Sequence, residues 1–229
     1  MATRSRIPGL GGWGDDPLWG HFYDWTVDHP TPGRAIWALG LGSDLGRLYD
    51  ATAEIGVQPA GAAILDVPCG GGVALRGVRP GQGIRYVAAD ISQLMLDRTM
   101  AEAETLGVAD QVEPCIADVH ALEFADGEFD MVLSFTGLHC FPDPHRAVLE
   151  MGRVTRTGGV LLGSALLNTP VLSRGGLRSV PVRRVGRLAG LLGPGCTRAE
   201  TQAWIAEAGF VDVDVEMSGP IGYFRGVRT

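Results

Sequence analysis

The stretch of residues 64–75 constrains the fold more than any other part of the chain. It reads ILDVPCGGGVAL, in which a short apolar run with Asp66 near its end is followed by three glycines and a second apolar run. This order predicts a buried strand, a tight loop and the start of a helix. Because Gly70, Gly71 and Gly72 have no Cβ atom, the loop can turn sharply and lie close against a ligand. The N–H groups at the start of the helix would favour electron-rich ligand atoms.

Segments typical of strands and helices alternate around this loop, from residue 62 to residue 167. Further strands are expected at residues 84–89, 112–117, 129–135 and 160–167, with helices at 92–106 and 143–156. Such alternation predicts an α/β fold with a doubly wound parallel sheet. A helix at 198–208 and strands at 210–216 and 222–228 follow, and their hairpin would put one antiparallel strand on the sheet.

The chain divides into a helical cap, a ligand-binding core, an arginine-rich insertion and a closing segment that completes the sheet. These segments cover residues 1–60, 61–167, 168–197 and 198–229, respectively. Within the cap, residues 43–57 are expected to be helical, with Ser43 as the N-cap. Tyr23 and Trp25 belong to an aromatic cluster that either packs on the core or closes over a ligand.

Composition narrows the function classes. The 229 residues suffice for one sizeable core, and the net charge of −7 argues against general nucleic-acid binding. All basic residues are arginine, which excludes a lysine Schiff base and a P-loop lysine. The four cysteines form no C-x-x-C pair, so no metal site is expected. No leader or membrane-spanning run is evident, so a cytoplasmic location is expected.

Three aspartates follow successive predicted strands. Asp66, Asp90 and Asp118 stand at or near the strand ends where an open parallel sheet binds its ligands. Each one alone could merely cap a helix or begin a turn. Asp90 follows the glycine loop by about 20 residues, a spacing at which a carboxylate reaches ribose hydroxyls. Leu75 occupies the third glycine position of the dinucleotide pattern, which disfavours NAD. S-adenosylmethionine (SAM), a nucleoside without phosphate and with a cationic end, suits the loop better.

Together these segments resemble the class I SAM-dependent methyltransferases of methyltransferase type 11, the group that includes the ubiquinone/menaquinone C-methyltransferases. The resemblance covers about residues 62–165 in order and at the family's spacing. It is carried by ILDVPCGGG at 64–72, ADISQLML at 89–96, ADV at 117–119, FDMVLS at 129–134, LH at 138–139 and LEMGRVTRTGG at 149–159. The resemblance implies a Rossmann-like sheet of seven strands with the last one antiparallel.

The resemblance also implies roles at the methionine end of SAM. The backbone around Gly70 and Gly72 would lie along the methionine part, Asp66 would help to hold its ammonium group, and Ser134 would face it. The family usually has glycine where this chain has Pro68. Proline fixes φ and has no N–H group, so a ligand contact at that amide is unavailable.

At the adenosine end, the resemblance implies that Asp90 takes the ribose hydroxyls and that Ile91 packs on adenine. Asp118 would accept a hydrogen bond from the adenine amino group, and the Val119 backbone would contact the ring.

His139 is the best candidate for a base, because it follows the fourth predicted strand, where an acceptor should approach, and its neutral form is available near pH 7. A purely structural histidine at the start of a loop or helix is the alternative. His120 and His145 are weaker candidates.

The segment 171–195 mixes arginines, Arg178 and Arg183 among them, with many aliphatic residues. It could be a solvated lid, could admit an anionic acceptor, or could rest on an anionic membrane surface. We favour a lid over a small or apolar acceptor.

The expected function is transfer of a methyl group from SAM to a small, apolar acceptor by in-line displacement, in a monomer or homodimer. An NAD(P)-dependent oxidoreductase and a SAM-binding protein without catalysis are the alternatives.

Overall fold

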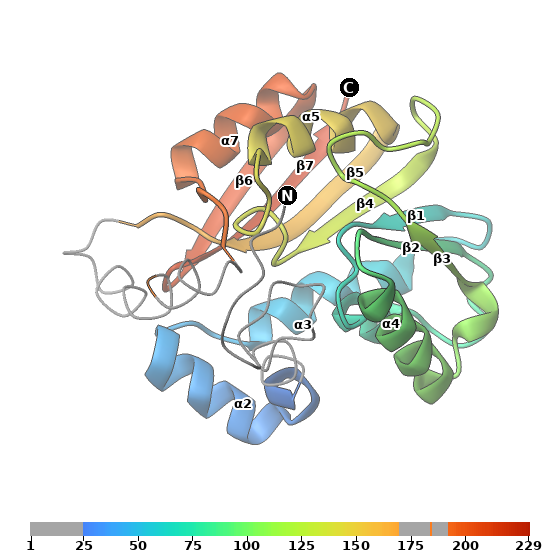
Figure 1. Ribbon diagram of the computed structural model, residues 1–229, viewed down its shortest axis with the longest axis horizontal. Helices are drawn as coiled ribbons and strands as arrows, with labels where there is room; N and C mark the ends of the chain where they lie inside the picture. The colour runs from blue at the N-terminus through green and yellow to red at the C-terminus, as the bar shows by residue number, and fades with distance from the viewer. Residues whose placement is uncertain (1–24, 170–183, 185–191) are drawn as a thin grey trace.

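The computed structural model describes residues 25–169, 184 and 192–229, and its centre is one seven-stranded sheet (Figure 1). The strand order is β3-β2-β1-β4-β5-β7-β6. The strands are β1 (Ala63–Asp66), β2 (Arg85–Asp90), β3 (Val112–Ile116), β4 (Phe129–Phe135), β5 (Thr155–Leu166), β6 (Phe210–Ser218) and β7 (Ile221–Arg228). Strands β1 to β5 run parallel, whereas β7 runs antiparallel to β5 and β6. The predicted sheet with a closing antiparallel strand is therefore confirmed.

Helices cover both faces of this sheet, with α3 and α4 on one side and α5 and α7 on the other (Figure 1). The α-helices that lie wholly within the described residues include α2 (Pro30–Ile36), α3 (Gly46–Ala53), α4 (Gln93–Leu106), α5 (Pro144–Val154) and α7 (Arg198–Glu207). The π-helix η2 (Trp37–Leu41) continues α2, and the 3₁₀ helices within the described residues are η3 (Ile55–Val57), η4 (Val73–Gly77) and η5 (Ala109–Gln111).

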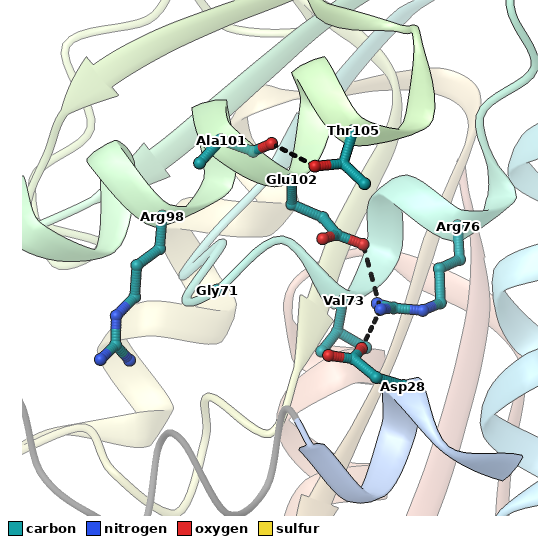
Figure 2. Close-up of a pocket in the computed structure, with 8 residues that line it drawn as sticks. All are labelled: Asp28, Gly71, Val73, Arg76, Arg98, Ala101, Glu102 and Thr105. Atoms are coloured by element: carbon teal, nitrogen blue, oxygen red, sulfur yellow. Dashed lines mark hydrogen bonds and ion pairs between the residues drawn. The ribbon is translucent and has the colours of Figure 1, made fainter.

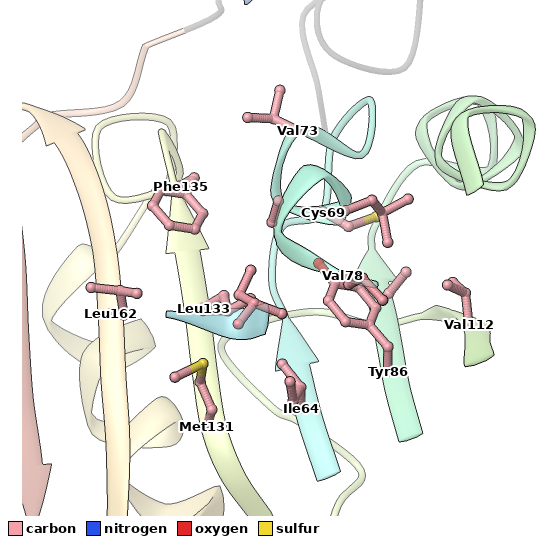
Figure 3. Packing of buried hydrophobic residues seen from close by; sticks show 14 of the residues in the cluster. Ile64, Cys69, Val73, Val78, Tyr86, Val112, Met131, Leu133, Phe135 and Leu162 are labelled. Carbon is pink, nitrogen blue, oxygen red and sulfur yellow. The ribbon is translucent and has the colours of Figure 1, made fainter. Parts of the chain in front are cut away.

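The apolar core consists of two layers, one on each face of the sheet. Ile64 and Leu65 are consecutive in β1 and fully buried, yet they belong to different layers. Met131 and Val132 of β4 divide in the same way, and Figure 3 shows Ile64 and Met131 side by side in the first layer. A parallel strand that is covered on both faces needs apolar residues at consecutive positions. This requirement explains why the predicted strands read as continuous apolar runs.

The cap begins its helix later than the sequence indicated. Helix α3 starts at Gly46 with Leu45 at the N-cap position, so the prediction that Ser43 caps a helix from residue 43 is wrong. Ser43 is instead buried and donates from its hydroxyl to the hydroxyl of Ser218, at the end of β6 (3.2 Å). The hydroxyl serves a contact between distant segments, which the local pattern could not reveal.

A β-bulge in β6 changes which of its valines face the core. The register between β6 and β7 shifts between Val211 and Asp214, and Asp212 has a φ of 51°. Val211 is consequently 45% exposed, while Val215 is fully buried. The alternating valines of this strand suggested one shared face, but one additional residue in the strand moves Val211 to the other face.

The described ends of the 168–197 insertion meet at the loop after β4. The Asn168 N–H donates to the Cys196 carbonyl (2.6 Å), and the Gly193 N–H donates to the His139 carbonyl (2.9 Å). Residues 170–183 and 185–191, which include Arg178 and Arg183, lie outside the described residues. In the ranges that are described, no helix has both the length and the apolar character needed to cross a bilayer.

Candidate functional site

The glycine loop lies over the carboxyl ends of β1 and β2, where it is held by backbone bonds on both sides. The Val67 N–H donates to the Leu133 carbonyl of β4 (2.9 Å), and the Cys69 N–H donates to the Ala89 carbonyl of β2 (2.9 Å). The loop then turns through Gly70 and Gly72, whose φ angles of 52° and 85° are left-handed and favour glycine. The short helix expected after the loop is a 3₁₀ helix, η4.

Asp90, the last residue of β2, ties the loop to the sheet. Its Oδ2 accepts the Gly70 N–H (3.1 Å), and its Oδ1 accepts the Ser92 N–H (2.9 Å). Burial raises the pKa of the Asp90 carboxyl, while these backbone donors act in the opposite direction. Ile91, the next residue, is 70% exposed. A carboxylate and an accessible aliphatic side chain thus stand together beside the loop, as the ribose and adenine roles would require.

Asp66, at the end of β1, lies below the loop and not on its surface. It is only 1% exposed, and its Oδ2 accepts a hydrogen bond from the Tyr86 hydroxyl (2.7 Å). Burial raises the pKa of Asp66 to about 7, and the charge of Asp90 adds to this rise, whereas the Tyr86 bond opposes it. A charge on Asp66 would therefore act on a ligand from beneath the loop.

Asp118, after β3, is tied to the histidine two residues later. Its Oδ1 accepts the His120 N–H (2.9 Å) and lies 2.7 Å from His120 Nδ1. The pKa of Asp118 is lowered, chiefly because its carboxylate accepts the backbone N–H of His120. Val119 between them is buried. The structure thus brings together Asp90, Ile91 and Asp118 at the ends of two neighbouring strands, since the register pairs Asp90 with Ile116.

Ser134 and His139 belong to the far side of the loop, at the end of β4. Ser134 is fully buried, and its Oγ has no hydrogen-bond partner among the described residues. His139 is partly buried, and its Nδ1 accepts the Leu166 N–H (3.1 Å). Trp25 is 43% exposed and stacks on His29, with ring centroids 4.7 Å apart. Tyr23, Arg178 and Arg183 lie outside the described residues.

A pocket beside the loop, lined by both charged and apolar residues, lies outside the predicted site. It has a volume of about 280 Å³ and is lined by Gly71, Val73 and residues of α4 (Figure 2). Arg76 of η4 bridges its two sides, since its Nη2 donates to Glu102 of α4 (3.0 Å) and to Asp28 of the cap. The only signal of this bridge in the sequence is that Arg76 is the first basic residue after the glycines.

Across residues 25–169 and 192–229, no group of three or more His, Cys, Asp or Glu side chains is arranged to hold a metal ion.

Comparison with known proteins shows what the glycine loop and the strands around it are similar to. Residues 65–163 match the family model described as methyltransferase domain. An uncharacterized protein of Mycobacterium tuberculosis is 35% identical over 137 residues, which are 56% of this chain and 47% of the relative. The chain thus spans about half the length of the curated relatives it matches.

Two solved structures share the fold. Phosphoethanolamine N-methyltransferase 2 of Haemonchus contortus, in complex with SAM, superposes with a TM-score of 0.65 at 14% identity, covering 90% of this chain and 60% of that one. The [4+2]-cyclase SpnF superposes with a TM-score of 0.62 at 21% identity, covering 80% of each chain. At these identities the likeness concerns the fold alone, and the fold has been adapted to more than one reaction.

Proposed function

We propose that the chain transfers a methyl group from SAM to a small acceptor, and the match of residues 65–163 to the methyltransferase domain model supports this proposal. The observation that carries the proposal is the position of Asp90. This carboxylate holds the glycine loop through Gly70 and stands next to the exposed Ile91, so one short segment can bind both the ribose and the adenine of SAM.

The charges around the loop favour SAM over a dinucleotide. The loop itself contains no basic residue, and the carboxylates of Asp66 and Asp90 lie beneath and beside it. Such a site repels a pyrophosphate and attracts the cationic methionine end of SAM. In addition, Leu75 fills the position of the third glycine of a dinucleotide loop with a side chain that is fully buried.

Calorimetric titration tests this proposal. We expect the purified protein to bind SAM and S-adenosylhomocysteine, the product of methyl transfer, and not to bind NAD. Binding of NAD alone would refute the proposal. Binding of SAM without methyl transfer to any member of an acceptor panel would favour a SAM-binding protein that lacks catalysis.

We expect the acceptor to bind at the loop after β4, which lies between the glycine loop and the described ends of the insertion. Gly193, in one of these ends, donates its N–H to the carbonyl of His139. We therefore propose that the 168–197 insertion supplies part of the acceptor's surroundings, as a lid. Methyl transfer from a sulfonium group needs mainly alignment of the nucleophile with the methyl group and exclusion of water.

The hydrogen bond at His139 argues for a donor role rather than for a base. A neutral imidazole carries one proton, and its other nitrogen accepts. Because Nδ1 accepts the Leu166 N–H, the proton of the neutral ring belongs on Nε2. For Nε2 to take a proton from the acceptor, the ring would have to give up the bond from Leu166. We propose that neutral His139 acts as a hydrogen-bond donor through its Nε2–H group. The nucleophile of the acceptor would then react without transferring a proton to His139.

Nitrogen-15 NMR spectroscopy of the imidazole side chains measures the tautomer directly. At pH 8 we expect Nε2 of His139 to be protonated and Nδ1 to be unprotonated. His139→Gln identifies the resonances by their loss, and His145→Gln serves as the matched control on a partly exposed histidine that contacts Glu207. A proton on Nδ1 of His139 would restore the general-base hypothesis.

A further inference from the structure

Two loops of the candidate site meet at one glycine. The cofactor loop (residues 67–72) follows β1, and the acceptor-side loop (residues 136–141) follows β4. A Cβ atom on Gly137 would lie 2.5 Å from Pro68 Cδ, 2.7 Å from Ser134 Oγ and 2.9 Å from Phe141 Cζ. The proline ring of one loop therefore rests directly on the backbone of the other, with no room for a methyl group between them.

The position of Pro68 is determined by its neighbours on both sides. Val67 donates its N–H to Leu133 of β4, and Cys69 donates its N–H to Ala89 of β2, each at 2.9 Å. Because both flanking residues are bonded to strands of the sheet, the ring between them cannot easily move away from Gly137.

The acceptor-side loop is held in an unusual conformation. Thr136 has a φ of 57°, which is left-handed and unfavourable for a β-branched residue. The Thr136 N–H donates to the Ser164 carbonyl (2.7 Å), and the Leu166 N–H donates to His139 Nδ1 (3.1 Å). The surrounding contacts thus impose the shape of the loop that carries His139.

The contact between the loops is one of packing alone. Proline has no N–H to offer, and the neighbouring Ser134 hydroxyl has no hydrogen-bond partner among the described residues. Glycine, which the family usually has at this position, would leave the space of the ring empty. The distance between the two loops in this chain is therefore set by the proline ring.

We propose that Pro68 is a positioning residue that couples the cofactor loop to the acceptor-side loop. Its ring packs against Gly137 and sets the position of His139 relative to the methyl donor. A change in the conformation of either loop therefore alters the conformation of the other. The proposal rests on the proposed function, in which the first loop binds SAM and the second faces the acceptor.

Gly137→Ala tests the coupling by forcing the loops apart. Gly137 is not left-handed, so alanine is strained only by its neighbours. We expect SAM and S-adenosylhomocysteine to bind roughly tenfold more weakly, which corresponds to about 1.4 kcal/mol. We also expect the imidazole nitrogen-15 resonances of His139 to move, even without ligand. Unchanged affinity together with unchanged resonances would overturn the proposal.

Gly152→Ala is the matched control. A Cβ atom there would lie 2.7 Å from the Ala208 carbonyl oxygen and 2.8 Å from Ala208 Cβ, a similar overlap between α5 and α7. We expect this variant to lose stability, while its SAM affinity and its His139 resonances stay as in the wild type. Equal effects of both variants on SAM affinity would show that general destabilisation is the cause and would overturn the coupling.

Pro68→Gly in the Gly137→Ala background examines the contact itself. Removal of the ring should relieve the closest overlap and restore at least part of the lost affinity; failure to restore any would exclude Pro68 as the coupling residue.

If Gly137→Ala does not fold, Pro68→Ala replaces it, and unmoved His139 resonances would then refute the proposal. A wild-type protein that binds no SAM would refute the proposed function, whereas the ligand-free resonances would still report on the coupling.

Discussion

Replacement of Asp90 by alanine is expected to weaken SAM binding by about a hundredfold or more. The change removes the carboxylate assigned to the ribose hydroxyls and also the acceptor for the Gly70 N–H (3.1 Å). Hydrogen bonds to charged groups contribute about 1.5–3 kcal/mol each, so the loss of two amounts to at least two factors of ten. Calorimetric titration with SAM and S-adenosylhomocysteine measures the effect.

Asp130→Ala provides a matched control for Asp90→Ala. Like Asp90, Asp130 accepts a backbone N–H, but the donor is Ala63 (2.7 Å) at the opposite edge of the sheet, where β1 begins. We expect Asp130→Ala to lower the melting temperature and to leave SAM affinity unchanged. If Asp90→Ala also bound SAM as the wild type does, Asp90 would serve only to hold the loop.

The second large effect concerns pH, because the buried carboxyl of Asp66 has a pKa raised to about 7. SAM affinity is expected to rise several-fold between pH 6 and pH 8, since the ionised carboxylate attracts the ammonium group of SAM. Asp66→Asn cannot ionise, and its affinity should be lower at pH 8 and much less dependent on pH. Titrations of both proteins across this range measure the difference.

The same ionisation should lower the stability of the fold. Between the ordinary value of 3.8 and about 7, folded Asp66 keeps a proton that the unfolded chain has released. The stabilisation is fully present below pH 4 and is lost as pH rises through about 7. At about 1.4 kcal/mol per pKa unit, it amounts to as much as about 4 kcal/mol. The free energy of unfolding of the wild type should therefore fall relative to that of Asp66→Asn over this range.

Tyr86→Phe distinguishes Asp66 from other titrating groups. The Tyr86 hydroxyl donates to Asp66 (2.7 Å) and holds the pKa of that carboxyl below the value that burial alone would give. Loss of this donor should move the rise in SAM affinity to higher pH. Identical profiles for the wild type, Tyr86→Phe and Asp66→Asn would contradict the assignment to Asp66.

Much of the fold follows from local patterns in the sequence. The parallel strands are buried on both faces and therefore read as continuous apolar runs, and Thr197 and Glu200 form a capping box at the predicted start of α7. The match of residues 65–163 to the methyltransferase domain family confirms the resemblance. Assignment to the ubiquinone/menaquinone group stays a prediction.

The remaining features depend on contacts between residues far apart in the chain. The contact of Pro68 with Gly137 joins two loops that are far apart in the sequence and that only the packed sheet brings together. The proposed tautomer of His139 depends on Leu166, and the raised pKa of Asp66 depends on its complete burial, which the hydrogen bond from Tyr86 partly offsets. The bulge in β6 leaves no trace in its alternating valines and aspartates. None of these partners can be chosen from sequence spacing alone.

The two outer strands bear on how copies of the chain meet each other. An outer strand with unpaired backbone groups can recruit another chain, which leads to aggregation. Strand β3 is short and contains Pro114, which lacks an N–H group. Strand β6 carries the bulge and exposes the acidic side chains of Asp212, Asp214 and Glu216. Both outer strands therefore disfavour edge-to-edge β-pairing between molecules, which should help keep the protein dispersed at high concentration.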